Sequence, residues 1–94
     1  MSVARIAIFD EPPTLKDDDD RRARSLETLL RSLRGFIAGY EFREEASGRL
    51  MSVTVWESEE ALEAGVNAVR NRPLADQRGI RPSRVERWIV DSSF

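Results

Sequence analysis

The stretch MSVTVWESEEALEAG, residues 51–65, changes from a strand pattern to a helix pattern within two residues. Its first positions alternate, with Met51, Val53 and Val55 on one side, which is typical of a β-strand. Trp56 ends this alternation, and Ser58 follows as a helix N-cap with two glutamates directly after it. The sequence therefore predicts a strand that ends on a tryptophan and leads directly into a helix.

Three more strands are predicted from β-branched and aromatic residues. They lie at Val3–Phe9, Phe36–Arg43 and Arg84–Asp91. A turn that contains glycine, Glu45–Gly48, joins the second strand to Arg49–Trp56. These two strands should therefore form a β-hairpin.

A further helix is predicted between the first strand and the hairpin. Asp17–Asp20 is interpreted as its solvated first turn rather than as a cation site, because carboxylates are favoured at a helix N-terminus. Gly35 stands where a left-handed C-cap would end the helix. A leucine stripe runs between them, formed by Leu26, Leu29, Leu30 and Leu33. The order βαββαβ predicts an α+β fold of the ferredoxin-like type, with a four-stranded antiparallel sheet.

Length and composition limit what such a chain can do. With 94 residues the chain forms one domain, spanning residues 1–94, with a small core. It contains no cysteine and no histidine, so we expect no disulfide, no metal site of the usual zinc type and no cofactor. The net charge of −2 gives no reason to expect nucleic acid. The longest apolar run, Ile6–Phe9, is too short for a membrane span and no signal peptide precedes it, so we expect a soluble cytoplasmic protein.

Both faces of the predicted sheet carry apolar residues, although two helices can cover only one of them. On the hairpin, one apolar surface combines the residues Phe36, Ala38, Tyr40, Phe42, Met51, Val53 and Val55. A sheet that is apolar on both sides favours packing against a second sheet. We therefore expect a homodimer whose interface contains Tyr40, Phe42, Met51, Val53 and Val55.

The other face of the hairpin is mixed. It is predicted to carry Ile37, Gly39, Glu41, Arg43, Leu50, Ser52, Thr54 and Trp56. Gly39 would leave room, the hydroxyls of Ser52 and Thr54 would supply polar contacts, and Trp56 would form a wall. If this face lies under the helices, it is a candidate small-molecule pocket. Alternatively, Trp56 fills the corner between its strand and the second helix.

The stretch GFIAGYEFREEASGRLMSVTVWESEEALEAGVNAVRN, residues 35–71, resembles the antibiotic biosynthesis monooxygenase-like family of the dimeric α/β barrel superfamily. Within it, SVTVWESEEAL carries most of the resemblance. The final RVERWIV is similar to that family's last strand, and the opening ARIAIF also fits the family. The resemblance implies ferredoxin-like protomers that dimerise into an α/β barrel. Some members of the family are cofactor-independent oxygenases of aromatic polyketides, and others degrade haem.

The resemblance also implies roles for particular residues. A tryptophan at the position of Trp56 lines the ligand pocket in both groups. The histidine of the haem-degrading members would fall near Val66, which cannot ligate iron, so haem degradation is set aside. For monooxygenation, Glu41 would act as the base, Arg5 would stabilise the substrate anion and Asn67 would contact the substrate. Alternatively, Glu41 and Arg5 are ordinary surface charges and Asn67 is an exposed polar residue.

Two functions from different classes remain open at this stage. The first is a cofactor-independent monooxygenase that acts on a hydrophobic or aromatic small molecule. The second is a non-catalytic dimeric module that binds a ligand or scaffolds a partner. A ligand-sized space beside Trp56 with a buried ionisable group would favour the enzyme, and a packed corner would favour the module.

Overall fold

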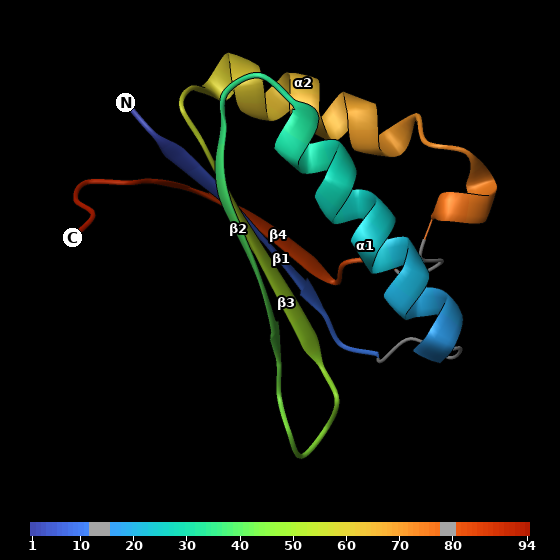
Figure 1. Cartoon of the computed structure of the whole chain (residues 1–94). Helices are drawn as coiled ribbons and strands as arrows, with labels where there is room; N and C mark the ends of the chain where they lie inside the picture. Colours follow the sequence, from blue (N-terminus) through green and yellow to red (C-terminus); the bar gives the residue numbers. More distant parts are fainter. Residues whose placement is uncertain (12–15, 78–80) are drawn as a thin grey trace.

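The strands and helices follow one another in the predicted order βαββαβ (Figure 1). This computed structural model describes residues 1–11, 16–77 and 81–94. It also describes their side chains, except those of residues 16–19. The elements are β1 (Val3–Phe9), α1 (Lys16–Ser32), β2 (Phe36–Arg43), β3 (Leu50–Trp56), α2 (Glu59–Arg70), the short 3₁₀ helix η1 (Leu74–Asp76) and β4 (Arg84–Ile89). The predicted ferredoxin-like fold is confirmed.

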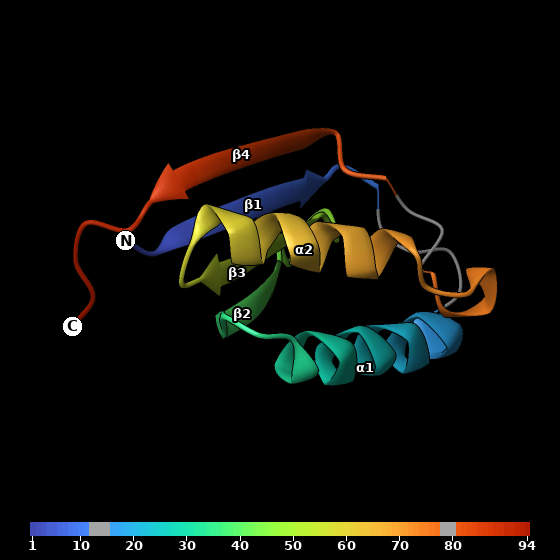
Figure 2. The same cartoon turned by 90° about the horizontal axis from the view of Figure 1, so that it is seen from above.

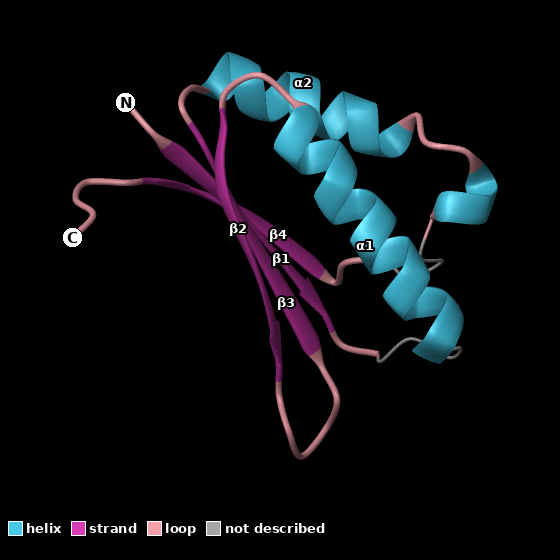
Figure 3. Ribbon diagram, viewed as in Figure 1, coloured by secondary structure: helices cyan, strands magenta, loops and turns pink. Residues whose placement is uncertain are grey.

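The four strands form one antiparallel sheet in the order β2-β3-β1-β4. Both helices lie on the same side of this sheet (Figure 1 and Figure 3). Seen from above, α1 and α2 run side by side along that side (Figure 2). Neither described helix has the length and continuous apolar character needed to cross a bilayer.

The register of the strands assigns each side chain to one of two faces. Val3 of β1 pairs with Trp56 of β3, and Trp56 packs against leucines of both helices, so this face lies under the helices. We call it the helix-side face; its members are Val3, Arg5, Ala7, Phe9, Gly39, Glu41, Arg43, Leu50, Ser52, Thr54, Trp56, Val85, Arg87 and Ile89. We call the opposite side the open face; its members are Ala4, Ile6, Ile8, Ala38, Tyr40, Phe42, Met51, Val53, Val55, Arg84, Glu86 and Trp88.

The core lies at one corner of the helix-side face. Leu30 of α1, Trp56 of β3 and Leu62 of α2 are buried together there, and Leu62 is fully enclosed. Partly buried apolar residues surround them, namely Val3, Leu26, Leu33, Phe36, Ala61, Val66 and Val69. The predicted leucine stripe of α1 therefore faces the core through Leu26, Leu30 and Leu33. From α2, the core receives Ala61, Leu62, Val66 and Val69.

The predicted helix ends are confirmed. The Ser58 hydroxyl accepts a hydrogen bond from the Ala61 amide at 3.1 Å, which caps α2. Gly35, with φ +84°, adopts the left-handed conformation after α1 that favours glycine. The predicted aspartate turn lies at the start of α1, although the side chains of residues 17–19 are outside the described part.

The prediction for the start of β2 is wrong. Phe36 was expected to share a face with Ala38, and Ile37 with Gly39. Instead, the register shifts between Phe36 and Ala38: Phe36 pairs with Trp56, and Ala38 already pairs with the neighbouring Val55. Because such a bulge inserts one residue, Phe36 contacts the helix-side core and Ile37 is left 54% exposed.

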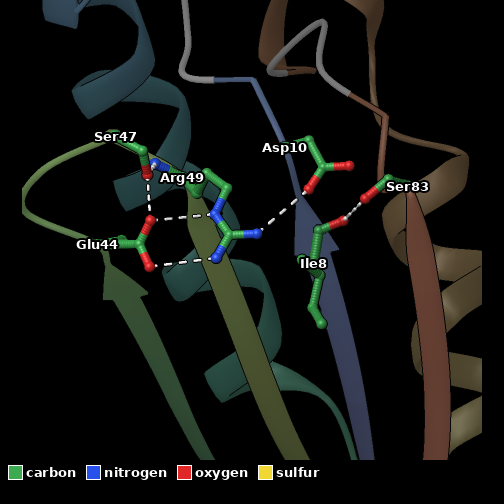
Figure 4. A network of polar contacts seen from close by, with 6 residues as sticks. All are labelled: Ile8, Asp10, Glu44, Ser47, Arg49 and Ser83. Carbon is green, nitrogen blue, oxygen red and sulfur yellow. Dashed lines mark hydrogen bonds and ion pairs between the residues drawn. The ribbon is translucent and has the colours of Figure 1, made fainter.

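Polar contacts fix the far end of the sheet (Figure 4). Glu44 at the end of β2 accepts hydrogen bonds from the Arg49 guanidinium and from the Ser47 hydroxyl. Arg49 also reaches Asp10 after β1, at 3.7 Å. The amide and hydroxyl of Ser83 both donate to the Ile8 carbonyl. These contacts join the hairpin turn and the start of β4 to the end of β1.

Candidate functional site

The structure brings six of the seven candidate pocket residues onto the helix-side face. Strand pairing places Gly39, Thr54 and Arg5 in one row across β2, β3 and β1. Glu41 and Ser52 lie in the next row, and Trp56 closes the face at the end of β3. The seventh candidate, Asn67, is exposed on α2.

Trp56 is part of the core rather than an open wall. Only 2% of its surface is exposed. The ring of Phe36 meets it edge-on, with 5.2 Å between the ring centroids. Its indole N–H donates to the Thr54 hydroxyl at 3.0 Å, so this donor is already used within β3. The corner-filling interpretation of Trp56 therefore agrees with the packing.

A glycine of α2 makes room for the indole. A Cβ atom at Gly65 would lie 2.2 Å from the Trp56 Cη2 atom, which is a severe clash. The sequence analysis did not identify this pairing of Gly65 with Trp56. A glycine in the middle of a helix, where it is unfavourable, was the available signal.

Gly39 does not leave free space of the kind predicted. A Cβ atom at this position would lie 3.1 Å from the tip of the Phe36 ring, so that ring occupies the room. The physical reason is the bulge, which turns Phe36 toward the helix side.

Glu41 and Ser52 are register partners at the edge of the helix-side face. Glu41 belongs to the outer strand β2 and its side chain is exposed, whereas Ser52 is half-buried on β3. Both carry groups that can exchange hydrogen bonds with a ligand lying on this face.

Arg5 is the ionisable candidate nearest the interior of this face. It is half-buried on the central strand β1, between Thr54 of β3 and Arg87 of β4. Burial of the guanidinium lowers the pKa of Arg5 from its ordinary value, and the positive charges of Arg87 and Arg70 lower it further. Within residues 1–11, 16–77 and 81–94, its guanidinium has no hydrogen-bond or ion-pair partner.

Arg87 differs from its neighbour because two glutamates of α2 hold it. It forms ion pairs with Glu63 and, at 3.3 Å, with Glu59. The hydrogen bond with Glu63 is the main cause that raises the pKa of Arg87. The sequence alone does not place Arg87 beside Arg5, because only the pairing of β1 with β4 brings them together.

A depression of about 380 Å³ opens beside Arg87, between the start of α2 and the end of β4. Its lining consists of Met1, Val3, Ser58, Glu59, Arg87, Trp88 and Ile89. Three separate segments of the chain meet there, so no single motif in the sequence pointed to it.

No protein-family model matches the chain, and no curated protein matches it in sequence. Solved structures do match it in fold. A haem-degrading protein of Mycobacterium tuberculosis, at 21% identity, superposes with a TM-score of 0.72 over 100% of this chain and 99% of that one. SnoaB, a cofactor-independent oxygenase of Streptomyces nogalater, superposes at 13% identity with a TM-score of 0.75, over 98% of this chain and 95% of that one.

These likenesses cover the whole domain, from β1 to the residues after β4. They confirm the resemblance to the antibiotic biosynthesis monooxygenase-like proteins at the level of the fold. At such low identity these likenesses show the fold alone and assign no role to any side chain.

Proposed function

We propose that this protein is a cytoplasmic homodimer that acts as a cofactor-independent monooxygenase on a hydrophobic or aromatic small molecule. The observation that carries the proposal is Arg5, a half-buried cation on the helix-side face whose N–H donors are not used within the described residues. The shared fold with a cofactor-independent oxygenase, SnoaB, supports the class of reaction. Perturbed ionisable groups on such a face are typical of functional sites.

The chemistry requires a base and a cation on either side of the substrate. A base removes a proton from an activated methylene or phenol, and the resulting anion reduces O₂ directly. In an anthrone-type substrate the methylene carbon gains one oxygen atom as a carbonyl, and the other oxygen leaves as water with the two hydrogens. Arg5 would stabilise the anion and Glu41 would take the proton.

The positions of these two residues suit a flat substrate. Arg5 on β1 and Glu41 on β2 lie on the same face with β3 between them. Two strand spacings and an offset of two residues along the strands correspond to about 12 Å between their Cα atoms, which is enough for an aromatic ring system to lie across β3. Under this proposal the hydroxyls of Ser52 and Thr54 would lie beneath the substrate, and Asn67 would contact it from α2.

The homodimer is supported by the open face. Tyr40 is 58% exposed and Phe42 is 48% exposed, and their rings stack on each other with 6.2 Å between centroids. Neither helix covers this face (Figure 1). Exposed aromatic residues that are contiguous with Met51, Val53 and Val55 indicate a surface that a second copy would cover.

One observation favours a second candidate, the non-catalytic dimeric module. Trp56 is packed on both sides and its N–H donor is bonded within the chain. In this alternative the fold would bind a ligand or a partner without turnover.

Oxygen uptake with a panel of anthrones and quinols separates the two candidates. We expect uptake by the wild type, with kcat about 100-fold lower in Arg5→Gln and in Glu41→Gln, because each variant loses charge stabilisation or the base. Arg31→Gln, which changes an exposed arginine at the end of α1, is the matched control and should keep the wild-type rate. Dialysis against EDTA should leave the rate unchanged. Binding without oxygen uptake across the panel would favour the module.

A further inference from the structure

β4 is the strand of the sheet that the helices cover least. Of the described elements, α1 approaches β2, and α2 approaches β1, β2 and β3, whereas α2 reaches β4 through the ion pairs of Glu59 and Glu63 with Arg87. In the view from above, β4 forms the edge of the sheet that lies away from α1 (Figure 2). The helix-side residues of β4 are consequently accessible, with Val85 46% and Ile89 60% exposed. We call the surface between α2 and β4 the α2–β4 strip, with Val3, Arg5, Arg87, Ile89 and Arg70 as its members.

Positive charge gathers along this strip. Arg5 and Arg87 are register partners on β1 and β4, so their side chains start next to each other on the helix side. Arg70 is in the last turn of α2, on the same helical stripe as Glu63 two turns earlier. Both Arg87 and Arg70 lie near enough to Arg5 to lower its pKa.

The charges on the strip do not cancel. Among the described side chains, Glu59 and Glu63 are the carboxylates that reach the strip, and both are bound to Arg87. Arg5 and Arg70 have no acidic partner within the described residues. The strip therefore carries an excess of positive charge, centred on the half-buried Arg5.

A half-buried guanidinium without acceptors is unfavourable, because its N–H groups lose water and gain no replacement. A carboxylate supplies that replacement, since its two oxygens match the fork of the guanidinium.

An apolar surface adjoins the positive charge. Val3 and Ile89 are the next register pair on the helix-side face, two residues from Arg5 and Arg87, or about 7 Å along the strands. Both line the depression of about 380 Å³ at the start of α2, together with Met1, Ser58, Trp88 and the ion-paired Glu59 and Arg87. A ligand with an acidic group on Arg5 could therefore place an apolar body in this depression.

We propose that the α2–β4 strip binds an amphiphilic carboxylate, with Arg5 bonded to the carboxylate, Arg70 adding attraction, and the depression at Val3 and Ile89 holding the apolar part. The inference shares only Arg5 with the proposed function. It goes beyond that function, because its ligand extends from Arg5 toward the depression beside β4, whereas the proposed substrate would lie across β3 toward Glu41.

Calorimetric titration with octanoate, its uncharged match octanamide, and inorganic phosphate tests the proposal. We expect octanoate to bind the wild type about tenfold more tightly than octanamide, since a charge-assisted bidentate pair is lost in the amide. Arg5→Gln should remove this preference, Arg5→Lys should keep part of it, and Arg31→Gln should bind as the wild type does. Octanoate should also change the fluorescence of Trp88, which lines the depression.

Thermal melts of every variant check that the fold is intact. If Arg5→Gln does not fold, Arg5→Lys, which keeps the positive charge, still tests the role of the guanidinium. Equal octanoate affinity in Arg5→Gln and wild type would overturn the proposal. Phosphate binding as tightly as octanoate would also overturn it, because the apolar depression would then contribute nothing. Oxygen uptake with the anthrone and quinol panel is measured on the same samples. Octanoate binding that depends on Arg5, without oxygen uptake, would support this inference and contradict the monooxygenase. Oxygen uptake without such binding would support the monooxygenase and contradict this inference.

Discussion

Trp56 and Gly65 show how two residues define the corner of this molecule. The indole lies where a side chain at position 65 would otherwise be, and the Thr54 hydroxyl accepts its N–H. The sequence alone indicated that Trp56 ends a strand before a helix, but it left open whether the indole faces a ligand or the core. That choice depends on contacts between β3 and α2, which periodicity does not specify.

Replacing Gly65 with alanine tests this packing, because the packing decides whether the free energy of unfolding rises or falls. On an exposed helix surface, Gly→Ala adds about 1 kcal/mol of stability. Here the new methyl group would clash with the Trp56 ring, so we expect the free energy of unfolding to fall by about 1–3 kcal/mol in urea titrations.

The double variant Trp56→Phe/Gly65→Ala provides the control, because the smaller ring makes room for the methyl group. Its loss in free energy of unfolding should be smaller than the sum of the losses in the two single variants. A stabilised Gly65→Ala variant would show that the indole does not occupy this space.

Among the elements, the strands and helices were predictable and their faces only partly so. β1 and β2 have the predicted limits, and α2 begins after Ser58 as expected. The bulge between Phe36 and Ala38 was not predictable, because the pattern FIAGYEF reads as regular alternation and only pairing with β3 reveals the extra residue. Six candidate site residues follow from strand parity, whereas the place of Arg87 beside Arg5 requires the strand order.

The β2–β3 hairpin supports a prediction about pH. Hydrogen bonds from Arg49 and then from Ser47 lower the pKa of Glu44 below its ordinary value. Because the folded pKa is the lower one, this contribution to stability is present above the unfolded pKa of glutamate, and it is lost as pH falls through the folded pKa. Since Glu44 is fully exposed, we expect a small effect on stability.

Carboxyl chemical shifts measured by NMR against pH give the folded pKa of Glu44 directly. In Arg49→Gln the midpoint should move up toward that of an unperturbed glutamate, and Ser47→Ala should move it by less. Unchanged midpoints in both variants would contradict the hydrogen-bonded arrangement in Figure 4.

At the scale of the whole molecule, the two faces of the sheet have different roles. The helix-side face holds the core at one end and the Arg5 row beside it. The open face presents apolar side chains that no helix covers, such as Tyr40, Phe42 and Trp88. A domain of 94 residues buries a modest share of its surface, so covering this face would add much to its stability.

Light scattering coupled to size exclusion, at micromolar concentration, tests the central claim that a second copy covers the open face. We predict a mass twice the 10.7 kDa of the chain for the wild type, and monomers for Tyr40→Arg and Val53→Arg, which place a charge in the apolar contact. Tyr40→Arg should disturb the folding of the protomer less than Val53→Arg, because the Tyr40 side chain is already 58% exposed in the protomer. Thr28→Arg, at an exposed position of α1, should remain dimeric. A wild-type mass of 10.7 kDa would contradict the account.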